Sequence, residues 1–156
     1  VWNNLVMTNN IIEAIPLFLL LSGFVIGLGA VTVIDMHGFL GRKSSYWSEA
    51  TIRTHKVTKP LIWLGTTLAI IGGVLYFKNL PFTTIPLTLL CIAVVLILNG
   101  LFLSFVVSPY LLKQEVEGKS KELLPESWQK KVAFSFIISD LGWWSSLFLL
   151  AYYLSK

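Results

Sequence analysis

Two histidines and one aspartate are the residues of this chain whose types and spacing could hold a metal ion. Asp35 and His37 are separated by one residue, and His55 follows after a polar stretch. Imidazole nitrogens and carboxylate oxygens are common ligands of divalent transition metals, and two histidines can also ligate a haem iron from its two faces. Neither spacing is diagnostic. A divalent metal and haem b therefore stay open as cofactors, and a chain without a cofactor is the favoured alternative.

A second group of polar residues lies within long apolar stretches of the sequence. Asp140, Asn99 and Thr66 are each surrounded mainly by apolar residues. An ionisable side chain at membrane depth is costly, so it is a candidate for function. We expect these three residues to form a polar pocket with Asp35 and His37 at its rim, and we expect a hydrogen bond between Asp140 and Asn99. Polar contacts that only fix the register of helices are the alternative.

Four long apolar segments must position these residues. They cover approximately residues 11–35, 59–78, 84–108 and 130–154. A helix needs about 20 apolar residues to cross the hydrocarbon layer, and runs that are continuous rather than alternating exclude the strands of a barrel. Charged residues make up only 13% of the chain, against about 25% in soluble domains. The sequence therefore predicts an all-α, polytopic membrane protein, a four-transmembrane-helix bundle of two helical hairpins that forms one membrane domain over residues 1–156.

Basic residues are concentrated in two of the connections between these segments. Ten of the twelve Lys and Arg residues lie in or next to the connections 36–58 and 109–129. Because cytoplasmic loops carry an excess of Lys and Arg, both connections are predicted to be cytoplasmic and both termini to lie outside a bacterial inner (plasma) membrane. A net charge of +4 would suggest nucleic acid as the partner of a soluble protein. In a membrane protein its placement matters more, so nucleic acid is not an expected partner.

The start of the chain and its cysteine content give two further expectations. The first apolar segment has no basic residues before it and no small-residue cleavage site, so it is expected to act as an uncleaved anchor. The chain begins at Val1, and Met7 is an alternative start. Cys91 is the only cysteine, so no disulfide can form within one chain.

Small residues predict how two of the segments pack. Gly23 and Gly27 have the G-x-x-x-G spacing, and Gly65, Ala69 and Gly73 follow one another at intervals of four residues. Such stripes let helix backbones approach closely in lipid. We expect the first two segments to meet along them. A flat surface for a planar cofactor is the alternative.

Basic and aromatic residues near the ends of the segments have a simpler explanation. Lys59 follows His55 in a basic stretch that can face lipid phosphates. Trp63, Tyr110 and Trp128 lie where aromatic rings favour the headgroup level. We therefore expect these residues to anchor the bundle in the membrane.

Familiar enzyme motifs are missing from the sequence. It contains no H-E-x-x-H, no G-x-S-x-G, no phosphate-binding P-loop and no Rossmann glycine fingerprint. Nothing marks a nucleophile, so no catalytic residue is assigned. Whether the protein is an enzyme stays open, and the sequence leans against it.

Three stretches carry a resemblance to a known kind of protein. Residues 27–38 (GLGAVTVIDMHG), 55–63 (HKVTKPLIW) and 98–109 (LNGLFLSFVVSP) resemble those of an uncharacterised family of small four-span bacterial inner-membrane proteins. The resemblance covers nearly the whole chain and implies a helical bundle in the inner membrane, without an activity. The bundle is also loosely similar to four-helix b-type cytochromes and copper-resistance membrane domains. Those commonly place several histidines inside their spans, whereas this chain has none there.

Three functional hypotheses follow. The favoured one is a non-catalytic accessory, interaction or ligand-binding protein with a polar pocket in its cytoplasmic half. The first alternative is a redox protein that binds a metal or haem b through His37 and His55, and the second is a proton-coupled transporter that uses Asp140. The expected partners are the lipid bilayer and either further copies of the chain or a larger membrane complex.

Overall fold

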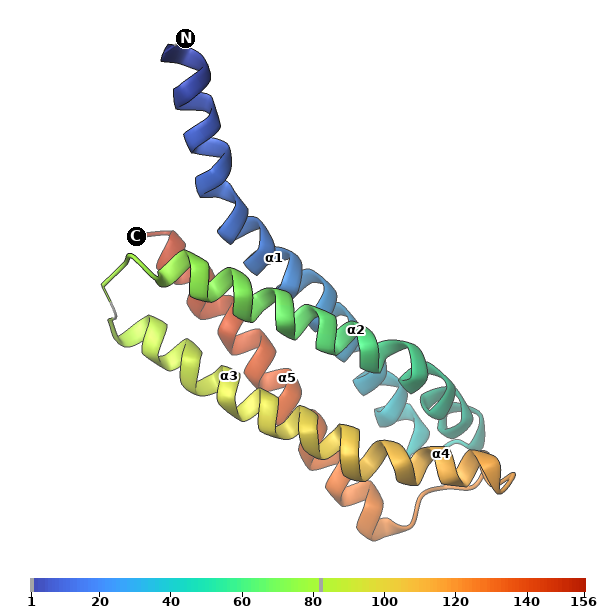
Figure 1. The fold of residues 1–156 in the computed structure, drawn as a ribbon. Coiled ribbons are helices and arrows are strands. Elements are labelled where there is room, and N and C mark those ends of the chain that lie inside the picture. The colour runs from blue at the N-terminus through green and yellow to red at the C-terminus, as the bar shows by residue number, and fades with distance from the viewer. Residues whose placement is uncertain (1, 82) are drawn as a thin grey trace.

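The described residues form six consecutive helical elements (Figure 1). The computed structural model describes the backbone of residues 2–81 and 83–156 and the side chains of residues 12–81 and 83–156. In chain order the elements are α1 (Trp2–Gly41), α2 (Ser45–Phe77), α3 (Thr84–Phe102), the π-helical turn η1 (Leu103–Val107), α4 (Ser108–Val116) and α5 (Glu126–Leu154). The described part of the chain contains no β-strand.

Four of the helical stretches are long and apolar enough to cross a membrane. They are Ile12–Gly41, Ser45–Phe77, Thr84–Val116 and Glu126–Leu154, and the shortest has 29 residues. At about 1.5 Å per residue each exceeds the ~30 Å hydrocarbon layer, so each must tilt or extend beyond the layer. The protein is therefore a multi-pass membrane protein with an all-α four-helix bundle, as predicted.

The helices are longer, and the connections shorter, than the sequence suggested. Residues 36–58 and 109–129 were expected as loops, but only 42–44 and 117–125 separate the helices there. Residues 45–57 are the first part of α2, which continues through Pro60. The reason is physical: a fall in hydropathy marks where polar residues begin, and a helix does not have to end there. Both connections lie at the end of the bundle opposite the C-terminus (Figure 1).

Helices α1 and α2 pack closely against each other, as the small residues predicted. A Cβ atom on Gly23 would overlap the backbone of Ala69 and the carbonyl group of Gly65. A Cβ on Gly72 would meet the backbone of Leu20 in the same way. The third close contact on α2 is thus made by Gly72, whereas a Cβ on Gly73 would lie 3.8 Å from the Leu20 side chain. Positions 65, 69 and 72 keep to one face because a helix repeats every 3.6 residues.

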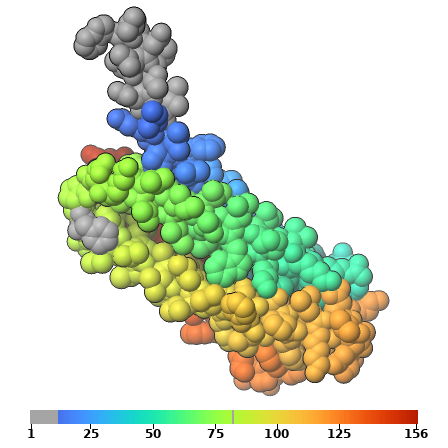
Figure 2. Space-filling model, viewed as in Figure 1, coloured from blue at the N-terminus to red at the C-terminus, as the bar shows by residue number. Residues whose placement is uncertain are grey.

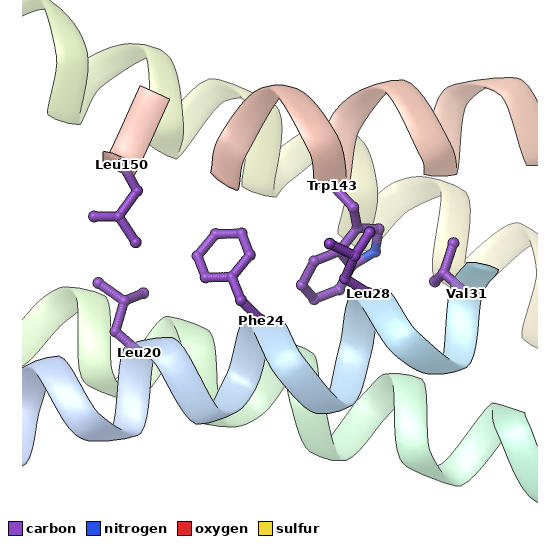
Figure 3. Packing of buried hydrophobic residues seen from close by; sticks show 6 residues of the cluster. All are labelled: Leu20, Phe24, Leu28, Val31, Trp143 and Leu150. Atoms are coloured by element: carbon purple, nitrogen blue, oxygen red, sulfur yellow. The ribbon is translucent and has the colours of Figure 1, made fainter. Parts of the chain in front are cut away.

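The main apolar core lies between α1 and α5 (Figure 3). Phe24 packs edge-on against Trp143, with ring centroids 5.7 Å apart and planes at 88°. The Trp143 ring also occupies the space beside Gly27 that a Cβ would fill. Helix α1 therefore contacts α2 along one side and α5 along another. Helix α5 packs in turn against α3. Helices α2 and α3 form the face seen in Figure 2, with α4 at the end that carries the connections.

A methyl group added at the contact between α1 and α2 should destabilise the bundle. We expect Gly65→Ala to lower the free energy of unfolding by about 1–3 kcal/mol, the usual cost of overpacking, because its Cβ would overlap the backbone of Gly27. Gly29→Ala is the matched control, since a Cβ there meets nothing within 4 Å. Relief of the glycine penalty should make that variant more stable by roughly 0.5–1 kcal/mol. Unfolding in mixed micelles with a denaturing detergent, followed by circular dichroism, measures both, and effects of the same sign would contradict the packing described.

Candidate functional site

A cavity of about 290 Å³ lies at the end of the bundle that carries the two connections. All four membrane-crossing stretches contribute to its walls, and Leu124 of the 117–125 connection adds to them. Most of the lining is apolar, as in Ile34, Val107 and Phe136. Its polar and charged side chains come from several elements: Asp35 from α1, Arg42 from the 42–44 connection, Ser48, Thr51, His55, Lys59 and Trp63 from α2, Ser104 from η1, and Gln129, Ser139 and Asp140 from α5.

Asp35 is the most unusual of these side chains. It is only 7% exposed, and its Oδ2 atom is buried without a hydrogen-bond partner among the described residues. Leaving a buried polar atom unsatisfied costs about 1–3 kcal/mol. Asp140 lines the same cavity from α5 and is partly buried. Within the described side chains, neither carboxyl group forms a salt bridge.

His55 reaches the cavity from α2. Its Nε2 atom is also buried, and no described residue forms a hydrogen bond with it. Lys59 and Trp63 follow at intervals of four residues, so the three side chains share one face of the helix. The Nζ atom of Lys59 donates to the carbonyl oxygen of Ser104 and to the hydroxyl of Ser108, both at 3.4 Å. Helix α2 therefore presents a basic and polar stripe to the cavity.

The π-helical turn η1 explains why the carbonyl oxygen of Ser104 is free to accept a hydrogen bond from Lys59. Pro109 has no amide hydrogen to give to the preceding turn, and the amide of Ser108 bonds to the carbonyl of Leu103 instead of that of Ser104. The Ser104 carbonyl is thus left for Lys59. Its hydroxyl accepts a 2.9 Å hydrogen bond from Nε1 of Trp63. A π-turn of this kind is often found at functional sites.

The 117–125 connection folds over the loop end of the cavity. The hydroxyl of Ser48 donates to the carbonyl oxygen of Glu122 at 3.1 Å. The Nε2 atom of Gln129 donates to the carbonyl oxygen of Leu124 at 2.7 Å. Next to Gln129 in the chain, the ring of Trp128 stacks on that of Tyr110, with centroids 3.9 Å apart. These two aromatic residues therefore pack against each other, so at least part of their role is structural.

His37 does not reach the cavity. Its Nδ1 atom lies 3.0 Å from the hydroxyl of Thr54, and its ring packs beside Trp47 at 5.2 Å between centroids. Residues two apart on a helix point in nearly opposite directions, which separates His37 from Asp35. No three His, Cys, Asp or Glu side chains among the described residues gather in a way that could hold a metal ion. The ligand set suggested for a metal or a haem, His37 with His55 and Asp35, is therefore not assembled.

The expected hydrogen bond between Asn99 and Asp140 is not formed, so this prediction was wrong. Nδ2 of Asn99 donates to the carbonyl oxygen of Ser135 at 3.0 Å, and the Ser135 hydroxyl donates back to Oδ1 of Asn99 at 2.6 Å. The expected pairing assumed that Asn99 and Asp140 lie at the same depth, counted in residues from the ends of their apolar segments. The helical rod that begins with α3 continues through η1 and α4, so Asn99 lies level with Ser135. This buried pair joins α3 to α5 outside the cavity.

Thr66 also lies elsewhere. Its hydroxyl donates to the carbonyl oxygen of Ile62 at 2.8 Å, and it lines a second, largely apolar cavity of about 200 Å³ near Phe24 and Trp143. Of the predicted pocket residues, Asp35 and Asp140 share the first cavity with His55. Proton-coupled transport through Asp140 stays a prediction.

Sequence reasoning missed Lys59, Trp63 and Ser104 as cavity residues. Lys59 and Trp63 had been assigned to the membrane surface, but their four-residue spacing from His55 could have placed them on its face. Ser104 carried no comparable signal, because its position depends on η1.

Comparison with known proteins gives no further identification. No model of a protein family, no curated protein and no solved structure matches this chain. The resemblance to small four-span bacterial membrane proteins therefore stays a prediction.

Proposed function

We propose that this chain is a non-catalytic ligand-binding protein of the bacterial inner membrane, and that its ligand occupies the cavity around Asp35. The observation that carries the proposal is the buried Oδ2 atom of Asp35, which has no partner in the described structure. Buried polar groups in proteins are almost always hydrogen-bonded. A ligand that donates to this oxygen would remove the cost of burying it.

The size and chemistry of the cavity support a small ligand. Its volume of about 290 Å³ lies just below the roughly 300–1,000 Å³ of ligand pockets. Mostly apolar walls with a few converging polar groups are also typical of such pockets. A hydrolytic role has less support, because a serine nucleophile needs a hydrogen-bonded base and no described serine bonds to the Nε2 atom of His55.

The orientation in the membrane follows from the positive charges. Lys and Arg residues are concentrated at the end of the bundle where both connections lie. By the positive-inside rule this end is cytoplasmic. The proposed ligand would then bind in the cytoplasmic half, with the C-terminus on the outer side.

Labelling of single cysteines tests this orientation. In a Cys91→Ala background, we expect Asn79→Cys to react with a membrane-impermeant maleimide in intact spheroplasts, because the α2–α3 turn lies outside. Lys121→Cys, in the 117–125 connection, should react only after lysis. Both positions are exposed, so accessibility to the reagent differs only by side of the membrane. The opposite labelling pattern would place the cavity on the outer side.

Replacing Asp35 separates a ligand-binding role from a structural one. We expect Asp35→Leu to raise the free energy of unfolding of the ligand-free protein by about 1–3 kcal/mol, since it removes an unsatisfied buried oxygen. Asn99→Leu should lower it by a similar amount, because it leaves Ser135 without its partner. Thermal and detergent unfolding compare the two variants. A loss of stability in Asp35→Leu would identify the carboxyl group as structural.

Native mass spectrometry tests binding directly. We expect the protein released from membranes in mild detergent to carry a bound small molecule or lipid as a defined mass adduct. Ala133→Leu should abolish the adduct, because residue 133 lines the cavity. Ala93→Leu is the matched control, since residue 93 lines the second cavity instead. Absence of an adduct from the wild-type protein, or its retention in Ala133→Leu, would argue against the proposed function.

A further inference from the structure

We propose that the ligand of this cavity is zwitterionic, with an ammonium group and an anionic group a few bonds apart. The inference rests on the ligand-binding function proposed above and names the class of ligand. Its basis is that acidic and basic side chains line one cavity and, within the described structure, form no salt bridge with each other.

The acidic side of the cavity is formed by α1 and α5. Asp35 and Asp140 both line it, and neither carboxyl group has a described Lys, Arg or His nitrogen within 4.0 Å. Asp35 is more than nine-tenths buried, and its Oδ2 atom is free to accept a hydrogen bond. A primary ammonium group supplies a positive charge and three N–H donors. Charge-assisted hydrogen bonds of this kind are stronger than neutral ones.

The basic side is formed by α2, toward η1. Within the part of the chain that the structure describes, Lys59 contacts only neutral oxygens there, at the long distance of 3.4 Å. Its ammonium group therefore keeps donor capacity for an anionic partner. His55, on the same face of α2, adds the unpartnered Nε2 atom. A carboxylate or phosphate group on the ligand would give the Lys59 ammonium group an anionic partner and would lie near the Nε2 atom of His55.

The balance of charges favours a ligand with both groups over one with a single charge. Asp35 and Asp140 line the same cavity as Lys59 and Arg42. A purely cationic ligand would satisfy Asp35 and leave Lys59 without an anionic partner. A purely anionic ligand would do the reverse. The apolar part of the lining, which includes Ile34, Val107 and Phe136, fits a short hydrocarbon body.

Two sources of such a ligand share this chemistry: a free amino acid and the headgroup of phosphatidylethanolamine. The first arm of the test uses three soluble probes with the same hydrocarbon body, namely leucine, leucinamide and 4-methylpentanoate. Binding to the full chain in detergent is measured by isothermal titration calorimetry. If the source is a free zwitterion, leucine should bind at least about tenfold more tightly than either singly charged probe, since each lost charged hydrogen bond costs about that factor or more.

The second arm uses lipids. Native mass spectrometry of the full chain, titrated with phosphatidylethanolamine, phosphatidylcholine or phosphatidylglycerol of the same acyl chains, reports the affinity of each. If the source is a lipid, phosphatidylethanolamine should bind about tenfold or more tightly than the others. The choline headgroup has no N–H donor for Asp35, and phosphatidylglycerol has no cation.

Charge-neutralising variants tie the preference to the cavity. Asp35→Asn and Lys59→Gln should each weaken binding of the preferred zwitterion by about tenfold or more. Glu126→Gln and Lys130→Gln are matched controls, because this pair lies at the exposed surface with side chains 81% and 76% accessible. They should leave binding unchanged. Asp140→Asn serves as the second acidic variant if Asp35→Asn does not fold, as judged by circular dichroism.

The outcomes separate this inference from the proposed function. A preference for leucine or for phosphatidylethanolamine that Asp35→Asn and Lys59→Gln both remove supports the zwitterion. Equal or tighter binding of the singly charged probes, with no preference for phosphatidylethanolamine, overturns it. If the mass adduct is nevertheless lost in Ala133→Leu, the cavity binds a ligand of another class. If that adduct is absent or survives Ala133→Leu, the proposed function fails as well.

Discussion

The close approach of α1 and α2 is the contact on which the rest of the bundle depends. In a bilayer, an apolar side chain gains little when it moves from lipid to a neighbouring helix, because lipid tails are equally apolar. Helices therefore associate mainly through close packing and polar contacts. Gly23, Gly65 and Gly72 let the two backbones touch. This places α1 between α2 and α5, where Trp143 fills the space beside Gly27. At the loop end, the same arrangement sets Asp35 of α1 and His55 of α2 around one cavity.

The sequence was sufficient for those parts of the structure that depend on one helix at a time. Segment length and hydropathy predicted the four spans, and glycine spacing predicted the contact between α1 and α2. The site depends on how helices are offset and rotated relative to one another. Asn99 pairs with Ser135 because α3 and α5 are offset along their axes, and no residue pattern specifies that offset. His37 was misplaced for a simpler reason: residues 36–41 were expected to be a loop, so the helical rotation that turns His37 away from Asp35 was not applied.

Two kinds of buried polar group coexist in the bundle, and their environments differ. Asn99 and Ser135 exchange two hydrogen bonds and satisfy each other. This pair holds α3 against α5. Asp35 and His55 each retain a buried atom with no partner in the described structure. The contrast between these satisfied and unsatisfied groups is the reason for proposing that Asp35 and His55 bind a ligand. That contrast, more than the mere presence of an aspartate in a span, singles out the cavity.

The π-helical turn η1 changes the rotational phase of everything that follows it on the same rod. On an uninterrupted helix counted from Asn99, residues 106, 110 and 113 would share its inward face, because intervals of 7, 11 and 14 residues return to one side. A π-turn inserts about one extra residue, which rotates the later side chains by roughly 100°. Leu111 is accordingly buried, whereas the Lys113 side chain is 71% exposed. A single added residue therefore keeps a lysine out of the bundle and lets one continuous rod present an apolar side at both of its ends.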